Sequence, residues 1–213
     1  MEGAVALFGL IAWTGVLGNG TQPLDSCLQG SPVRAFNAES EQIPFRTRSP
    51  WILYSYGGRS AVVLGSKELR RGGGLAIQYE RPDPKMKSED GHPGSLVLEL
   101  YYEGTHGGRI GTPISVRLDA VGITASALYR WNTKLAGIQY YIDLGWGIQA
   151  GNRTTRDLGS RINSTPLFGV GLSIGSPENE LLVGLRFKHI SNGGSVEDNN
   201  GQNQVVITLG RRI

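Results

Sequence analysis

Apolar and polar side chains alternate from one position to the next along most of the chain after residue 50. In residues 181–191 the odd positions carry Leu181, Val183, Leu185, Phe187, His189 and Ser191. The even positions carry Leu182, Gly184, Arg186, Lys188 and Ile190. Because successive side chains of a β-strand point to opposite faces, this segment is expected to be a strand. One of its faces is an apolar stripe that ends in a histidine and a serine.

Seven further segments show the same alternation, at residues 52–56, 75–80, 96–103, 122–131, 138–149, 168–175 and 205–209. The eight expected strands are an even number, and eight antiparallel strands close a small barrel. No linker rich in proline or serine divides the chain, so residues 50–213 are expected to form one barrel domain.

The composition of the two faces indicates which one points outward. The second face holds Gly, Ser, Thr and Gln, together with Glu80, Glu99, Arg130, Asp143 and Arg186. Glycines and charges of both signs suit a narrow, crowded interior, whereas a face in water would carry more Lys and Glu. We therefore expect the apolar face to be outside, as in an all-β, eight-stranded antiparallel outer-membrane barrel. A soluble lipid-binding barrel, with its apolar face inside, is the less favoured alternative.

Composition narrows the class further. The chain has 32 glycines in 213 residues, about twice the usual share, which is typical of many strands joined by tight turns. A net charge of +3 with scattered basic residues gives no indication of nucleic-acid binding. Its single cysteine, Cys27, cannot form an internal disulfide.

The N-terminal region predicts export. Residues 4–17 are uncharged and mostly apolar, about the length of the apolar part of a signal peptide. Glu2 stands where a signal peptide normally has Lys or Arg. We expect residues 1–20 to be a signal peptide and residues 21–49 to be an irregular leader.

His189 and Ser191 are the candidate catalytic pair. They are two positions apart on one face, so an imidazole base and a hydroxyl would lie close together at the end of an apolar surface. This arrangement favours a hydrolase that acts on an apolar substrate. The alternative is that both are ordinary polar residues at the rim of the barrel.

The surrounding residues resemble a known family. Residues 187–194, Phe-Lys-His-Ile-Ser-Asn-Gly-Gly, and residues 199–203, Asn-Asn-Gly-Gln-Asn, resemble the motif of the lipid A 3-O-deacylases, the PagL family. The resemblance implies an outer-membrane esterase of Gram-negative bacteria that removes an ester-linked acyl chain from lipid A, with no metal and no cofactor. It also implies Ser191 as the nucleophile and His189 as the general base.

The resemblance extends to the groups around this pair. Asn192, Gly194 and Asn199 match positions that shape the site or donate hydrogen bonds to the oxyanion. The third member of the triad departs from the family, because Asn203 stands where the best-known pattern has a glutamate. Asn203 shares the face of the apolar residues that follow it, so we expect it to orient the imidazole. Glu197 and Asp198, in the intervening loop, are the alternative acids.

Other polar clusters have simpler interpretations. Glu99, Glu103, Asp119 and Asp143 resemble paired catalytic acids, but we expect lumen charges neutralised by Arg117 and Arg130. The segment 153–161 is expected to be an extracellular loop that could meet lipid A phosphates.

The expected partner is lipid A, or lipopolysaccharide, in the outer membrane. A homodimer is a further possibility, and no nucleic acid is expected. The rival class is a non-catalytic outer-membrane barrel, structural or adhesive, with a degenerate site.

Overall fold

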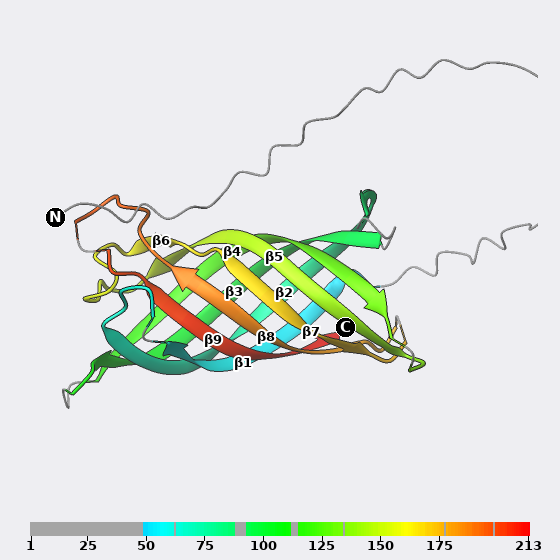
Figure 1. The fold of residues 1–213 in the computed structure, drawn as a ribbon, viewed down its shortest axis with the longest axis horizontal. Coiled ribbons are helices and arrows are strands. Elements are labelled where there is room, and N and C mark those ends of the chain that lie inside the picture. The colour runs from blue at the N-terminus through cyan, green and yellow to red at the C-terminus, as the bar shows by residue number, and fades with distance from the viewer. Residues whose placement is uncertain are drawn as a thin grey trace, which may run out of the picture. The chain divides into compact units, whose positions relative to one another are not determined.

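A computed structural model of the chain describes residues 49–61, 63–87, 93–111, 115–133, 135–176, 178–197 and 199–213. The expected signal peptide and nearly all of the expected leader therefore lie outside the described residues. The strands are β1 (Trp51–Ala61), β2 (Glu68–Lys87), β3 (Pro93–Arg109), β4 (Val116–Asn132), β5 (Ile138–Gly151), β6 (Ile162–Ser164), β7 (Leu167–Ile174), β8 (Leu181–Ile190) and β9 (Gln202–Arg212) (Figure 1). Among the described residues, no helix is long and apolar enough to cross a membrane.

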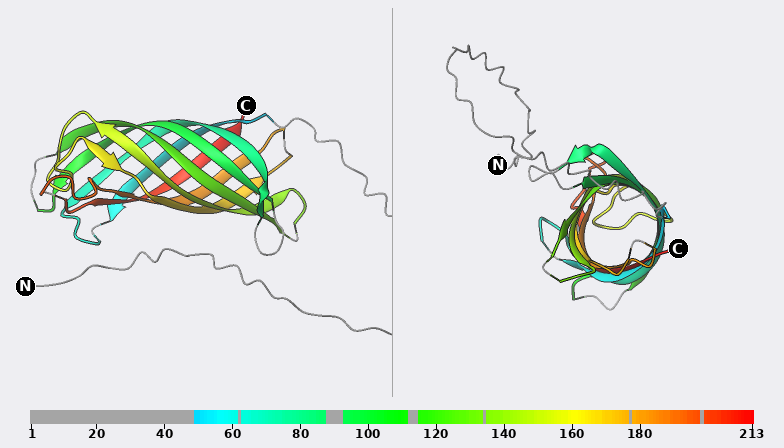
Figure 2. Two further views of the ribbon diagram at one scale, coloured as in Figure 1. Left: turned by 90° about the horizontal axis from the view of Figure 1, so that it is seen from above. Right: turned by 90° about the vertical axis from the view of Figure 1, so that its right-hand side faces the viewer.

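The strands form one closed antiparallel sheet. Consecutive strands pair with each other, except that β6 and β7 both pair with β5. The first strand, β1, also pairs with β9, with Ile52 opposite Arg212 and Ala61 opposite Asn203. Viewed end-on, the strands make a complete ring (Figure 2). This closure leaves no unpaired edge and confirms the predicted barrel.

Two of the nine segments, β6 and β7, belong to one barrel strand. Ser164 of β6 lies opposite Ile148 of β5, and Leu167 of β7 lies opposite Gly145, so the register with β5 continues across the break. The break falls at Thr165 and Pro166, where proline lacks the N–H that a central strand needs. The barrel therefore has eight strands, as the alternation predicts.

The outer wall is apolar, as expected. Large hydrophobic side chains point outward and are exposed on every barrel strand, among them Leu53, Leu75, Leu98, Ile123, Trp146, Phe168, Leu185 and Ile207. In β8 the odd positions are exposed or half-buried, whereas Leu182, Lys188 and Ile190 are buried. The face that carries His189 is consequently the outer one.

The lumen is filled by ion pairs. Arg186 lies between Glu99 and Asp143, at 2.7 Å from each carboxylate. Arg130 and Arg212 share the carboxylates of Glu80 and Glu180, and Lys188 pairs with Glu103. Charges buried in this way are tolerated because each one is paired.

The expectation for Arg117 and Asp119 is wrong. These two residues pair with each other at 2.9 Å on the outer face of β4, where the Arg117 side chain is exposed. The lumen partners of Glu99 and Glu103 are instead Arg186 and Lys188. Charged residues can pair only when their side chains lie on the same face of the sheet, whatever the signs of their charges.

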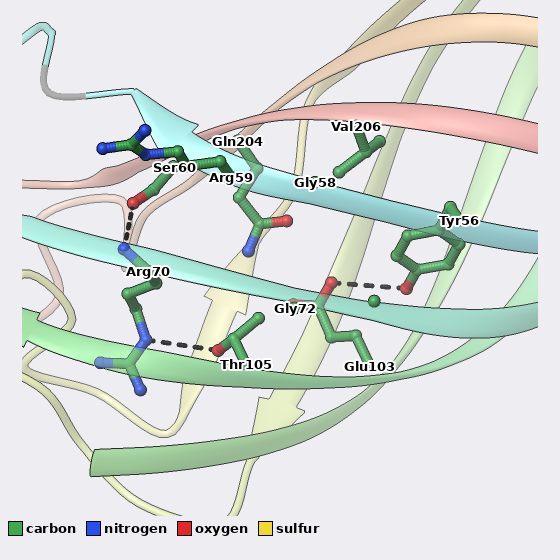
Figure 3. A pocket seen from close by; sticks show the side chains of 11 residues that line it. Tyr56, Gly58, Arg59, Ser60, Arg70, Gly72, Glu103, Thr105, Gln204 and Val206 are labelled. Atoms are coloured by element: carbon green, nitrogen blue, oxygen red, sulfur yellow. Dashed lines mark hydrogen bonds between the residues drawn. The ribbon is translucent and has the colours of Figure 1, made fainter. Parts of the chain in front are cut away.

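Two cavities that lie inside the barrel among the described residues are small, at about 10 and 20 Å³. A cavity of about 10 Å³ lies among Tyr56, Arg70, Glu103 and Thr105, where Tyr56 donates to Glu103 and Arg70 Nε donates to Thr105 (Figure 3). A Cβ added at Gly184 would lie 2.1 Å from the hydroxyl of Tyr141, so only glycine fits beside that ring. The interior is a packed core and not a pore.

The longest connections gather at one end of the barrel. Residues 152–161, between β5 and β6, and residues 191–201, between β8 and β9, both lie at the end where β8 finishes. At the opposite end the strands are joined by residues 88–92, 133–137 and 175–180. The candidate catalytic residues belong to the end with the long connections.

Candidate functional site

His189 and Asn203 face each other across β8 and β9. They are direct partners in the strand register, and Nδ1 of His189 lies 2.7 Å from Oδ1 of Asn203. Asn203 is fully buried although it shares the outward phase of Val205 and Ile207. The backbone N–H of His189 donates to the carbonyl of Pro166 at 2.9 Å. His189 is thus held on both sides, its imidazole by Asn203 of β9 and its backbone by Pro166.

The orientation of the Asn203 amide determines the tautomer of His189. Nδ2 of Asn203 donates to the carbonyl of Val63 at 2.6 Å, so Oδ1 is the atom that faces the imidazole. An oxygen acceptor requires Nδ1 of His189 to carry its hydrogen. In the neutral ring Nε2 then keeps its lone pair, as a general base needs.

Gly201 forms one wall of the imidazole site, a role that the sequence motif alone did not reveal. A Cβ built at this position would lie 2.7 Å from Cε1 of His189, and the residue has a φ of +72°. Any other L-residue would strain the backbone and press on the ring. The only sequence signal was the glycine in the second motif, residues 199–203.

Ser191 lies just beyond the end of β8 and is paired with Ser164. Backbone hydrogen bonds of 2.7 and 3.1 Å join the two residues, and their hydroxyl oxygens are 3.4 Å apart. Ser164 Oγ also donates to the carbonyl of Ser191 at 3.0 Å, so the Ser191 hydroxyl is the donor between the two side chains.

The side chains of Ser191 and His189 are each hydrogen-bonded to another residue in this arrangement. Within the described part of the chain, no hydrogen bond joins the two side chains. Ser191 Oγ is instead directed to Ser164, which lies in β6, a strand that the sequence motif does not include. A hydrogen bond to Nε2 of His189 would replace the one between the Ser191 and Ser164 hydroxyls.

All three expected site-shaping residues form hydrogen bonds inside the loop after β8. Oδ1 of Asn192 accepts from the N–H of Gly194 at 2.8 Å, and the N–H of Asn192 donates to Oδ1 of Asn199 at 3.0 Å. Gly194 has a φ of +83°, in the left-handed region that favours glycine. The N–H groups of Asn192 and Gly194 and the Oδ1 of Asn199 are therefore engaged inside the loop.

The alternative acids are placed differently. Glu197 is exposed in the turn after β8 and, among the described residues, has no hydrogen bond to His189. Asp198 lies outside the described residues.

Asp157 in the segment 152–161 ties the loops at this end together. Its fully buried carboxylate accepts hydrogen bonds from the Ser66 hydroxyl at 2.8 Å and from the N–H of Glu68 at 2.7 Å. Its carbonyl accepts from the N–H of Gly201 at 3.1 Å. The wall of the imidazole site is thereby connected to the turn between β1 and β2.

An eight-stranded barrel with an apolar outer wall, and with a His/Ser pair at one end of that wall, defines a small barrel of the outer-membrane type that carries a candidate hydrolytic site. The chain belongs to the lipid A 3-O-deacylase (PagL) family, whose model matches residues 71–212.

A solved structure of this family shows the same fold, and two other barrels match less well. The crystal structure of the outer membrane enzyme PagL superposes with a TM-score of 0.57 at 18% identity, covering 76% of this chain and 99% of that one. Neisserial surface protein A matches with a TM-score of 0.48 at 16% identity, covering 76% and 96%. The N-terminal β-barrel domain of Pseudomonas aeruginosa OprF matches with a TM-score of 0.39 at 18% identity, covering 77% and 97%. No curated protein sequence is significantly similar to the chain.

Proposed function

We propose that this protein is a serine esterase of the Gram-negative outer membrane that removes the 3-O-linked acyl chain from lipid A. The observation that carries the proposal is the hydrogen-bonded series Val63–Asn203–His189, which leaves Nε2 as the base on the face of β8 that leads to Ser191. Membership of the lipid A 3-O-deacylase family supports the substrate and the acyl position.

The apolar outer wall supports a position within the bilayer. Barrels of this type have short turns on the periplasmic side and longer loops outside the cell. The end with the segments 152–161 and 191–201 is accordingly assigned to the extracellular side. His189 and Ser191 then meet the outer leaflet, where the sugars and acyl esters of lipid A lie.

The reaction begins when the Ser191 hydroxyl turns from Ser164 to His189. Oγ attacks the ester carbonyl carbon and its proton passes to Nε2 of His189. When the tetrahedral intermediate collapses, the bond between the carbonyl carbon and the sugar oxygen breaks, and Nε2 returns the proton to the departing sugar hydroxyl. Water then attacks the acyl-Ser191 ester with the same base, and the fatty acid is released.

Asn199 supports the charged intermediate in this proposal. Its Oδ1 accepts from the N–H of Asn192, and its Nδ2 forms no hydrogen bond among the described residues, so Nδ2 can donate to the oxyanion. One such donor is usually worth about two to three orders of magnitude in turnover.

Mass spectrometry of lipid A tests the proposal. The folded barrel, reconstituted with lipid A, should release one acyl chain, and S191A and H189A should each abolish the release. Because the pair acts as a unit, the double variant should be scarcely slower than either single variant. S55A, at an exposed serine of the outer wall of β1, is the matched control and should be fully active.

A non-catalytic barrel is the second candidate function. It is favoured by the placement of the Ser191 hydroxyl against Ser164 and by the amide at position 203. If the folded wild-type protein leaves lipid A intact, or if S191A keeps its activity, the esterase proposal is wrong.

A further inference from the structure

The outer wall of β1 to β4 carries a row of basic side chains, one on each strand. Arg59 lies directly opposite Arg71, Arg71 opposite His106, and His106 opposite Arg117. All four side chains are exposed on the outer face. The four residues thus form a line across four adjacent strands. Three of them are arginines, and the fourth is a histidine, which can be protonated.

The row of basic side chains lowers the stability of the barrel when no anion is bound to it. Like charges directly opposite each other on neighbouring strands repel. Arg117 is partly neutralised by Asp119 at 2.9 Å. For Arg59 and Arg71, no ion pair with a carboxylate occurs within the described residues. The repulsion between these two guanidinium groups is relieved when an anion binds between them.

The surface beside the row has room for such an anion. A groove of about 320 Å³ is lined by Arg59, Leu69, Arg70, Arg71, His106, Gly107 and Ser115. Guanidinium groups bind phosphate through paired N–H donors, which suits two arginines on one side of a groove.

The residues next to the row match the rest of a lipid molecule. One step along the outer face towards the opposite end of the barrel, the register partners are Gly57, Gly73 and Gly104, followed on β4 by Asp119, which is paired with Arg117. One step further they are Ser55, Leu75, Tyr102 and Val121, most of them large apolar residues. From the row towards the opposite end, the outer wall therefore carries first basic side chains, then mostly glycines, then mostly apolar side chains. A phosphorylated glycolipid presents its phosphate, sugar and acyl chain in the same order.

We propose that this row, with Arg59 and Arg71 at its centre, is a binding site for the phosphate groups of lipid A in the surrounding leaflet. The site lies to one side of the candidate catalytic residues, because Arg59 is opposite Val205 and Val205 is opposite Phe187 of β8. Two such steps place it roughly 10 Å from β8. Binding at this site does not require hydrolysis.

Retention of lipid A by the S191A barrel tests the proposal without interference from turnover. The protein is reconstituted in phosphatidylcholine vesicles that contain either phosphorylated lipid A or lipid A stripped of its phosphates. Native mass spectrometry then counts the lipid A molecules that stay bound. The added changes R59Q and R71Q together should lower retention of the phosphorylated lipid by about tenfold and leave retention of the dephosphorylated lipid unchanged.

R211Q is the matched control, since Arg211 is an exposed arginine near the other end of the outer wall. It should leave retention unchanged. In phosphatidylcholine alone, R59Q and R71Q should unfold at the same temperature or higher, because each removes a repulsion. If the double variant does not fold, lipid A retention is measured for R59Q and R71Q separately.

Three outcomes would overturn the proposal. The first is unchanged retention of phosphorylated lipid A by the folded R59Q and R71Q variants. The second is an equal loss for both forms of the lipid, or an equal loss in R211Q. The third is displacement of lipid A by inorganic phosphate at low ionic strength, which would make the site one for free anions.

Discussion

Asn203 stands where the family resemblance leads one to expect a carboxylate, and this substitution has two separate effects. Its Oδ1 holds the Nδ1–H of His189, but a neutral amide would add no charge stabilisation to the imidazolium of the proposed reaction. Its Nδ2 binds Val63, which a carboxylate cannot do. Orientation of the base and stability of the site are therefore linked through one side chain.

Replacing Asn203 should separate these effects. N203A should lower turnover by roughly 10²–10⁴-fold, because the imidazole loses the partner that fixes its tautomer. N203D should raise turnover per folded molecule while it lowers the free energy of unfolding by about 1–3 kcal/mol, since a carboxylate oxygen would face the carbonyl of Val63. Rates of acyl release and urea unfolding measure the two quantities. An unchanged rate in N203A would show that His189 acts without this partner.

Gly201 offers a second test at the level of one residue. In G201A the new methyl group would lie 2.7 Å from Cε1 of His189, so the ring must move. A shift of this kind should lower turnover by about 10²-fold.

G193A is the control for G201A. Gly193 also has a positive φ, of +64°, but a Cβ there would have no atom within 4 Å. Both variants bear backbone strain, of about 1–3 kcal/mol, and only G201A disturbs the imidazole. Equal rates in the two variants would mean that the ring tolerates the displacement.

These residues show which parts of the candidate site can be predicted from the sequence. Alternation predicted outward phases for His189 and Asn203, and in the strands both residues share the phase of the outer-wall residues, although Asn203 is buried. The same alternation could not place Ser164 or assign a role to Gly201. Ser164 reaches Ser191 through the register of a distant strand, and the position of Gly201 depends on loop geometry.

At the level of the element, β8 shows how one strand serves two environments. Arg186 and Lys188 point into the ion pairs of the lumen, while Val183 and Leu185 belong to the outer wall. V183R should therefore cost about 2–4 kcal/mol near the middle of the bilayer. Reversible urea unfolding in lipid vesicles measures this cost.

L181R is the matched control for V183R. Leu181 is exposed at the first position of β8, close to the rim, where an arginine should cost only about 0–1 kcal/mol. Equal costs at positions 181 and 183 would contradict the proposed position of the bilayer.

Strand lengths were less predictable than strand number. The segments expected at 75–80 and 96–103 are the central parts of β2 (Glu68–Lys87) and β3 (Pro93–Arg109). Alternation is strong only where one face of a strand is a continuous apolar wall. Towards the ends the outer face carries glycine and charged residues, so the pattern fades although the backbone pairing continues.

For the molecule as a whole, Glu180 joins three parts of the barrel. It binds Arg130 of β4 and Arg212 of β9, and it receives a hydrogen bond from Ser173 of β7. E180Q removes one charge from a buried set and should lower the free energy of unfolding by about 3–5 kcal/mol. Thermal or urea unfolding, followed by the shift in gel mobility between folded and unfolded barrel, measures the change.

E197Q is the control for E180Q. Glu197 is exposed, so its replacement should leave both stability and acyl release unchanged. Loss of acyl release in E197Q would instead identify Glu197 as the acid of the triad.

The hydrogen bond between Asn203 and Val63 also affects when the candidate site forms during folding. It joins the last strand to the turn after the first one, across the seam where β9 meets β1 (Figure 1). Contacts between such distant parts of a chain form late in folding, because the intervening chain must first be ordered. We therefore expect an incomplete barrel to carry His189 and Ser191 without an oriented base. The chain would acquire esterase activity only at the moment when its two ends meet.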